Sequence, residues 1–106
     1  MSDAGPSQRL DKWLWAARFF KTRTQAQEAV NGGKVHVDGD RVKPARAVRV
    51  GQMLEITRGE VMLTVRIEGL AERRGPAPVA ATLYAETEES VARREAAAAV
   101  GHGGYR

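Results

Sequence analysis

Residues 9–20, with the sequence RLDKWLWAARFF, decide how the chain begins to fold. Four apolar residues in this stretch recur at the spacing i, i+3, i+4 and i+7, namely Leu10, Trp13, Leu14 and Ala17. This spacing is typical of an amphipathic helix whose apolar stripe faces a core. We therefore expect a helix over residues 9 to about 20, with Trp13 buried.

The next segment predicts a second, shorter helix. Thr22 is followed three positions later by Gln25, which is the capping-box pattern found at the start of helices. Gly32 and Gly33 can supply the left-handed backbone that commonly ends a helix. This helix should therefore run to about Asn31.

Beyond these glycines the spacing of apolar residues changes from the helical period to the alternation of strands. The strand candidates are residues 34–37, 41–43, 53–57 and 60–67. Asp38-Gly39 is a strong signal for a hairpin turn between the first two, and Pro44 limits the second. Short strands joined by turns predict a small, mainly antiparallel sheet.

The last part of the chain is rich in Ala and Glu and is expected to be mostly helical. Residues 79–84 fit a helix and a strand equally well. Thr87 is a candidate cap for a final helix that runs to Val100, and Gly101 with Gly103-Gly104 should end it in a frayed tail.

Composition narrows the class of protein. The 106 residues are enough for one domain. Cys is absent, which excludes disulfides, thiolate metal sites and cysteine nucleophiles and fits a reducing compartment. Residues 1–8 contain no apolar run, and no stretch approaches the ~20 apolar residues of a membrane helix. We expect a cytoplasmic protein without a signal peptide or a membrane partner.

The net charge of +4 is unevenly distributed along the chain. Residues 9–49 hold ten basic and four acidic residues, a net charge of +6. Residues 59–106 hold six basic and seven acidic residues, a net charge of −1. Charge that serves only solubility would be spread evenly, so the basic segment indicates nucleic-acid binding.

Several short motifs in this basic segment resemble the S4 domain, a family of RNA-binding modules named after protein four of the small ribosomal subunit. The matching motifs are Arg9-Leu10-Asp11, Thr22-Arg23 with Ala26, Gly33-Lys34-Val35 and Val37-Asp38-Gly39. Asp38 stands where the family usually has Asn, and both residues tolerate the turn. The resemblance implies an α+β fold in which a two-helix RNA-binding motif of the αL type packs on the sheet, followed by a C-terminal helix.

A longer run is very similar to the bacterial family of ribosome-associated heat-shock protein fifteen. It covers residues 9–23, and residues 72–74, 83–84 and 88–95 resemble the later part of that family. The resemblance implies binding to structured ribosomal RNA on free 50S subunits, and rescue or recycling of stalled subunits that carry nascent peptidyl-tRNA during heat stress. The family has a long basic C-terminal extension, whereas the tail here is near neutral, so contacts made by that extension should be absent or weaker.

This interpretation gives the chain three regions: a flexible leader at residues 1–8, an S4-like RNA-binding domain at residues 9–70, and a basic loop, C-terminal helix and frayed tail at residues 71–106. The resemblance places Arg9, Lys12 and Arg23 on the RNA-facing surface, together with Lys34. Gln27, one turn after Arg23, can add a neutral hydrogen bond. The full set of candidate RNA-binding residues is Arg9, Lys12, Arg18, Lys21, Arg23, Gln27, Lys34, Arg41 and Lys43.

Two aromatic residues leave two alternatives open. Trp15 and Phe19 lie on the Lys12 side of the first helix. An aromatic side chain beside cations can stack on an unpaired base, which makes Trp15 a candidate stacking residue. We favour the other alternative, in which the C-terminal helix covers both rings as a second small core, because so small a domain can hardly expose two large rings.

Catalysis and cofactors have no support in the sequence. His36 and His102 have no nucleophile or metal-ligand spacing around them, and Asp38-Gly39-Asp40 lacks the later ligands of a calcium loop. We expect a non-enzymatic monomer without cofactor or metal. Two other functions stay open: a module that guides an RNA-modifying enzyme in trans, and a protein-interaction adaptor that uses the C-terminal helix.

Overall fold

The computed structural model describes residues 5–103, with side chains described for residues 5–98. The start of the expected leader and the end of the expected tail lie outside the described residues. The helices are α1 (Leu10–Ala16), α2 (Arg23–Asn31), α3 (Ala77–Ala80), the short 3-10 helix η1 (Ala81–Leu83) and α4 (Glu88–Gly103). The strands are β1 (Gln8–Arg9), β2 (Val35–Val37), β3 (Asp40–Arg41), β4 (Ala47–Val48), β5 (Met53–Arg58), β6 (Val61–Ile67) and β7 (Tyr84–Glu86).

The first helix ends earlier than its apolar stripe predicts. The backbone N–H of Phe19 donates to Leu14 and that of Arg18 donates to Trp15, the two bonds of a Schellman termination. Arg18 occupies the left-handed position of this motif, with φ +67°, where glycine is usual. The chain therefore turns away after Ala16, and residues 17–22 connect the two helices.

The second helix has the boundaries and caps that the sequence predicts. Thr22 accepts a hydrogen bond from the backbone N–H of Gln25 at 3.0 Å, which confirms the cap. At the other end Gly33 adopts φ +79°, and the backbone N–H of Lys34 donates a hydrogen bond to the carbonyl of Ala29. This second Schellman motif turns the chain directly into β2.

Two antiparallel sheets follow. The larger has the strand order β3-β2-β5-β6-β7, and the smaller pairs β1 with β4. Asp38 and Gly39 both have positive φ, as the tight hairpin between β2 and β3 requires. The fold is the α+β arrangement expected, but β1, β4 and β7 were not predicted. Gln8, assigned to the leader, is buried in β1 and bonds to Ala71.

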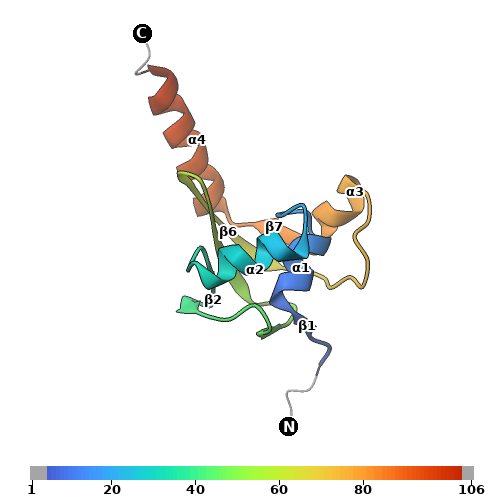
Figure 1. Ribbon diagram of the computed structural model, residues 1–106. Coiled ribbons are helices and arrows are strands. Elements are labelled where there is room, and N and C mark those ends of the chain that lie inside the picture. Colours follow the sequence, from blue (N-terminus) through green and yellow to red (C-terminus); the bar gives the residue numbers. More distant parts are fainter. Residues whose placement is uncertain (1–4, 104–106) are drawn as a thin grey trace.

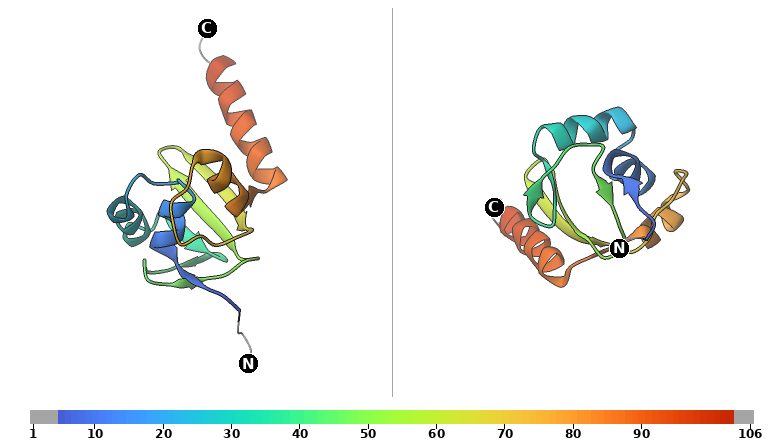
Figure 2. Two further views of the ribbon diagram at one scale, coloured as in Figure 1. Left: turned by 90° about the vertical axis from the view of Figure 1, so that its right-hand side faces the viewer. Right: turned by 90° about the horizontal axis from the view of Figure 1, so that it is seen from below.

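One hydrophobic core lies between the helices and the larger sheet. Trp13 is fully buried at its centre, stacks on Phe19 and meets Tyr84 edge to face. The expectation that α4 covers Phe19 is wrong, because Tyr84 of β7 packs on that ring with 4.7 Å between centroids. α4 instead contacts β6 and projects away from the body (Figures 1 and 2). It also runs past Gly101, where the sequence predicted its end.

Candidate nucleic-acid interface

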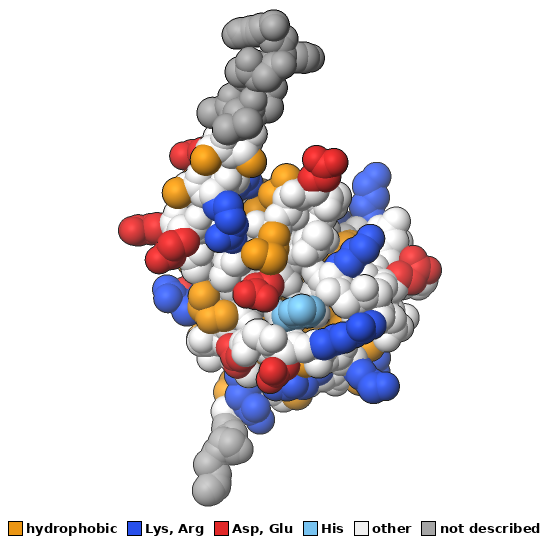
Figure 3. All heavy atoms as spheres, turned by 90° about the vertical axis from the view of Figure 1, so that its left-hand side faces the viewer, with side chains coloured by type: hydrophobic (Ala, Val, Ile, Leu, Met, Phe, Trp, Pro, Cys, Tyr) orange, Lys and Arg blue, Asp and Glu red, His pale blue; other side chains and the backbone are white. Residues whose placement is uncertain are grey.

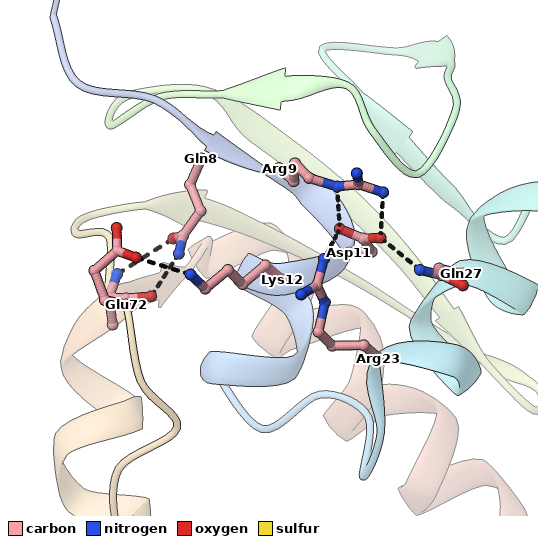
Figure 4. A network of polar contacts seen from close by, with 8 residues as sticks. Gln8, Arg9, Asp11, Lys12, Arg23, Gln27 and Glu72 are labelled. Atoms are coloured by element: carbon pink, nitrogen blue, oxygen red, sulfur yellow. Dashed lines mark hydrogen bonds and ion pairs between the residues drawn. The ribbon is translucent and has the colours of Figure 1, made fainter.

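A buried carboxylate organises the start of the two helices. Asp11, fully buried in α1, accepts hydrogen bonds from Arg9 at 3.1 and 2.9 Å and from the amide of Gln27 at 2.9 Å. Arg23 approaches the same carboxylate at 3.4 Å. Figure 4 shows the side chains of these four residues, which we name the Asp11 cluster, converging from β1, α1 and α2.

The two arginines of the Asp11 cluster remain accessible. The side chains of Arg9 and Arg23 are 51% and 41% exposed, whereas that of Asp11 is 0% exposed. Two positive charges therefore face solvent while the single negative charge is covered. Because Arg23 and Gln27 are one turn apart on α2, helix geometry alone places them on the same side.

The pKa of Asp11 reflects this arrangement. Burial of the carboxyl by itself raises the pKa, but hydrogen bonds from Arg9 and Gln27 and the charges of Arg9 and Arg23 outweigh that effect. The pKa of Asp11 is therefore held below its ordinary value. At neutral pH the carboxylate is charged and keeps both guanidinium groups beside it.

Lys12 lies next to the Asp11 cluster but has a partner of its own. Its ammonium group lies 2.8 Å from a carboxylate oxygen of Glu72, which ties α1 to the loop after β6 (Figure 4). Lys12 is thus partly neutralised, and an RNA phosphate would have to compete with Glu72 for it.

Arg41 and Lys43 border a hollow beside the C-terminal end of α2 with Asn31 and Val42. A guanidinium nitrogen of Arg41 donates to the backbone carbonyl of Asn31 at 2.8 Å. Positive charge and hydrogen bonding at the last carbonyls stabilise a helix end. Arg41 thus has a structural contact, whereas the ammonium of Lys43 has none among the described residues.

Arg18 lies apart from the other candidates. Its side chain donates to the backbone carbonyl of Gly75 at 2.8 Å, at the far end of α1 from the Asp11 cluster. Arg74, in the same loop, donates back to the carbonyl of Trp15 at 3.0 Å. These two arginines fasten the loop before α3 to the end of α1.

Lys21 and Lys34 come together on the other side of α2. They line an open groove, which we name the Lys34 groove, between α2 and the turn that joins β5 to β6. The residues around it are Phe19, Phe20, Lys21, Gln25, Glu28, Ala29, Lys34, Thr57, Arg58 and Gly59. The nine candidates thus do not form one patch, because α2 separates the Asp11 cluster from this groove.

The ring of Trp15 is half-buried and packs against the core. This position allows only part of the ring to meet a base, so the role of Trp15 in stacking stays a prediction. Phe19 is buried and cannot stack on RNA.

Sequence reasoning missed two residues of this interface. Asp11 was not identified as a site residue, because a lone acid between Leu10 and Lys12 is usually exposed. The available hint was its spacing of three residues from Leu14 and four from Trp15, which places Asp11 on an apolar side of the helix. Arg58 lies outside residues 9–49, and only the pairing of β5 with β2 brings it beside Lys34.

The surface charge agrees with a localised basic region. In Figure 3, Lys and Arg side chains predominate along the right-hand and lower edges of the face that shows the histidine, and Asp and Glu predominate near the base of α4.

Among the described residues there is no group of three or more His, Asp or Glu that could hold a metal. Asp38 instead accepts hydrogen bonds from Met53 and Gln52 across the sheet. None of the described helices is long and apolar enough to cross a membrane.

Comparison with known proteins identifies the region that carries these sites. A family model described as S4 domain matches residues 8–54. Heat shock protein 15 of Escherichia coli K12 is 52% identical over 87 residues, which are 82% of this chain and 65% of that protein. The chain therefore spans about two thirds of the length of that relative. The RQC P-site tRNA stabilizing factor of Bacillus subtilis is 33% identical over 64 residues, 60% of this chain and 74% of the relative.

A solved structure has the same fold. Heat shock protein 15 of Vibrio cholerae superposes with a TM-score of 0.86 at 45% identity, over 90% of this chain and 96% of that one. That protein is described as trimeric, so the comparison does not support our expectation of a monomer. None of these three names denotes an enzyme.

Proposed function

Because the chain belongs to the heat shock protein 15 family of S4-domain proteins, we propose that it binds structured ribosomal RNA through the Asp11 cluster. The observation that carries the proposal is the pairing of two half-exposed arginines with one covered carboxylate inside residues 8–54. Guanidinium groups held in a fixed orientation suit phosphate oxygens, because they can donate two parallel hydrogen bonds. The start of α2 adds the positive end of a helix beside Arg23.

The particle to which the protein binds is the free 50S subunit, and the role is rescue or recycling of stalled subunits with nascent peptidyl-tRNA during heat stress. One relative is named for stabilizing P-site tRNA, which supports a site near tRNA. The proposed RNA-binding domain is residues 9–70, which extends the matched segment through β6, and the compartment is the cytoplasm.

Co-sedimentation with purified 50S subunits and with intact 70S ribosomes tests this proposal. We expect binding to 50S and weak or no binding to 70S. Arg23→Ala is the first variant, because its 3.4 Å contact with Asp11 is the longest of the cluster and Asp11 keeps Arg9 and Gln27. Loss of one phosphate contact should reduce the log–log slope of affinity against salt by roughly one unit.

Arg66→Ala is the matched control. Arg66 also forms a surface ion pair, at 2.8 Å from Glu68, and lies on β6 away from both helices. Its removal should leave the salt slope unchanged. Equal effects of both substitutions would contradict the assignment to the Asp11 cluster, and absence of binding to either particle would contradict the ribosomal role.

A further inference from the structure

The two long sides of α2 carry different chemistry. Arg23 and Gln27 lie on one side and belong to the Asp11 cluster, whereas Gln25 and Glu28 line the Lys34 groove on the other. An RNA that lies across the exposed surface of α2 would therefore meet two separate basic sites. The Lys34 groove is the second of these sites.

The cations of the Lys34 groove have no partners. Within the described part of the chain, the side chains of Lys21, Lys34 and Arg58 form no ion pair or hydrogen bond. Glu28 is the one acid among the lining residues, which leaves a net charge of +2. Arg9 and Lys12, in contrast, are paired with carboxylates. An anion can bind in the groove without displacing an internal partner.

The backbone holds these cations close together. The N–H of Thr57 donates to the carbonyl of Lys34 at 2.8 Å, which fixes the start of β2 against the end of β5 and so places Arg58 beside it. On the opposite wall, the Gln25 side chain accepts from the N–H of Lys21 at 3.2 Å. The cations therefore stand on both walls of the groove rather than on one.

The groove has room for more than a phosphate group, and one of its walls carries an aromatic ring. Its volume is about 570 Å³, within the range typical of ligand sites, about 300–1,000 Å³. Phe20 is half-buried at its edge, packed against the core on one side and lining the groove on the other. Proteins recognise single-stranded and bulged RNA by stacking unpaired bases on such rings beside cations.

We propose that the Lys34 groove binds one unpaired nucleotide of the RNA, with its phosphate between Lys21, Lys34 and Arg58 and its base on Phe20. The proposal rests on the proposed function, because it adds a second contact to the same RNA. A regular duplex is held through phosphates at the Asp11 cluster, and an extruded nucleotide adds affinity and selectivity at the groove.

The test compares two RNAs that differ by one nucleotide: a blunt hairpin, and the same hairpin with a single unpaired adenine. The native protein should bind the second RNA at least about fivefold more tightly, as expected for one stacked base. Arg58→Ala, on an exposed side chain, should lower the affinity for the hairpin with the unpaired adenine more than the affinity for the blunt hairpin, and so abolish most of this preference. Arg66→Ala should change neither affinity.

Direct evidence for stacking comes from 2-aminopurine at the unpaired position. Its fluorescence should change when the native protein binds and should change much less with Phe20→Leu, which keeps an apolar contact to the core. The thermal unfolding midpoint of each variant establishes that it is folded at the assay temperature.

Three outcomes are distinguishable. A preference for the unpaired nucleotide that Arg58→Ala and Phe20→Leu both remove supports the groove. Equal binding of the native protein to both RNAs, or a preference that survives both substitutions, overturns the groove proposal, while binding that still depends on Arg23 keeps the proposed function. Failure of the native protein to bind either RNA overturns both.

Discussion

The guanidinium of Arg9 donates two parallel hydrogen bonds, of 3.1 and 2.9 Å, to the carboxylate of Asp11, which is two residues later in the chain. The carboxylate is wholly covered while half of the arginine side chain is exposed. A bidentate pair of this kind fixes the orientation of the arginine in addition to the electrostatic attraction, because the planar guanidinium contacts both carboxylate oxygens at once. Arg9 is thereby oriented before RNA arrives, so less conformational entropy is lost on binding.

Replacement of Asp11 by Asn should lower the stability of the protein. Asp11→Asn keeps the size of the side chain but removes the charge that accepts from Arg9 and Gln27, and it leaves two arginines without their counterion. We expect the free energy of unfolding to fall by about 1.5–3 kcal/mol at pH 7, the range for hydrogen bonds to charged groups. Urea denaturation of both proteins measures this difference.

The same comparison has a defined pH dependence. The pKa of Asp11 is lower in the folded state than its ordinary value of about 3.9. The stabilisation is therefore complete above that value and is lost as the pH falls through the lower, folded-state pKa. The difference between native protein and Asp11→Asn should be constant from pH 7 to about pH 5 and shrink below about pH 4. Glu72 and Glu86 also have lowered pKa values, but both proteins contain them. A difference that does not shrink at all below about pH 4 would contradict this role of Asp11.

Arg41 and Lys43 should separate into a structural and an RNA-binding residue. Arg41→Ala removes the hydrogen bond to Asn31 at the end of α2 and the packing of its guanidinium near Gly33. We expect it to lower the free energy of unfolding by about 0.5–1.5 kcal/mol, whereas Lys43→Ala should stay within about 0.5 kcal/mol.

In RNA binding, Lys43→Ala should have the larger effect on the salt dependence of affinity, whereas Arg41→Ala has the larger effect on stability. Lys43→Ala should reduce the log–log slope by roughly one unit, as for a lost phosphate contact, and Arg41→Ala should reduce it little. If Arg41→Ala left stability unchanged and flattened the slope, Arg41 would contact RNA instead of capping α2.

Local sequence signals predicted the elements whose ends are set by a few neighbouring residues. The helix cap at Thr22, the terminating Gly33 and the Asp38-Gly39 turn all act over three or four residues, and the structure confirms each. The reciprocal bond of the capping box is absent, because the Gln25 side chain accepts from the backbone N–H of Lys21 and not of Thr22. The end of α1 escaped prediction because Arg18 takes the left-handed position without being Gly. The strands β1, β4 and β7 have two or three residues each, too few for alternation to show, and exist through pairing with distant segments.

For the candidate site, charge clustering along the sequence located a basic region but not its arrangement. Sequence spacing places Arg23 and Gln27 on one side of α2, which the structure confirms. It could not show that α2 stands between Arg23 and Lys34, or that Arg41 turns back to the backbone of Asn31. Those facts depend on tertiary contacts, which a count of charges along the sequence does not reveal.

Trp13 should contribute more to stability than Trp15. Trp13 is fully buried, donates its indole N–H to the carbonyl of Gly69 at 2.8 Å and contacts two other rings, whereas Trp15 is half-buried. Trp13→Phe removes that hydrogen bond and leaves a cavity, so we expect a loss of about 2–4 kcal/mol in the free energy of unfolding. Trp15→Phe, the matched control, should cost less than about 1 kcal/mol. Equal losses would contradict the central place of Trp13 in the core.

Ser90 should decide how firmly α4 is attached to the sheet. Its hydroxyl is fully buried, accepts from the backbone N–H of Thr64 at 2.9 Å and donates to Glu86 at 2.6 Å. Glu86 is held in turn by Arg94 at 2.9 Å, and the hydrogen bond from Arg94 keeps the pKa of Glu86 below its ordinary value. One hydroxyl therefore joins β6, β7 and the first turns of α4.

Ser90→Ala leaves the partly buried N–H of Thr64 without its acceptor, which should cost about 1–3 kcal/mol. Because the loss is local to the contact between α4 and β6, hydrogen exchange at the Thr64 amide should accelerate more than exchange at Leu54 or Ile56 in the core strand β5. Glu89→Ala, one residue away on the exposed side of α4, is the control and should alter neither quantity. Unchanged protection of the Thr64 amide in Ser90→Ala would mean that contacts other than this hydroxyl hold α4 in place.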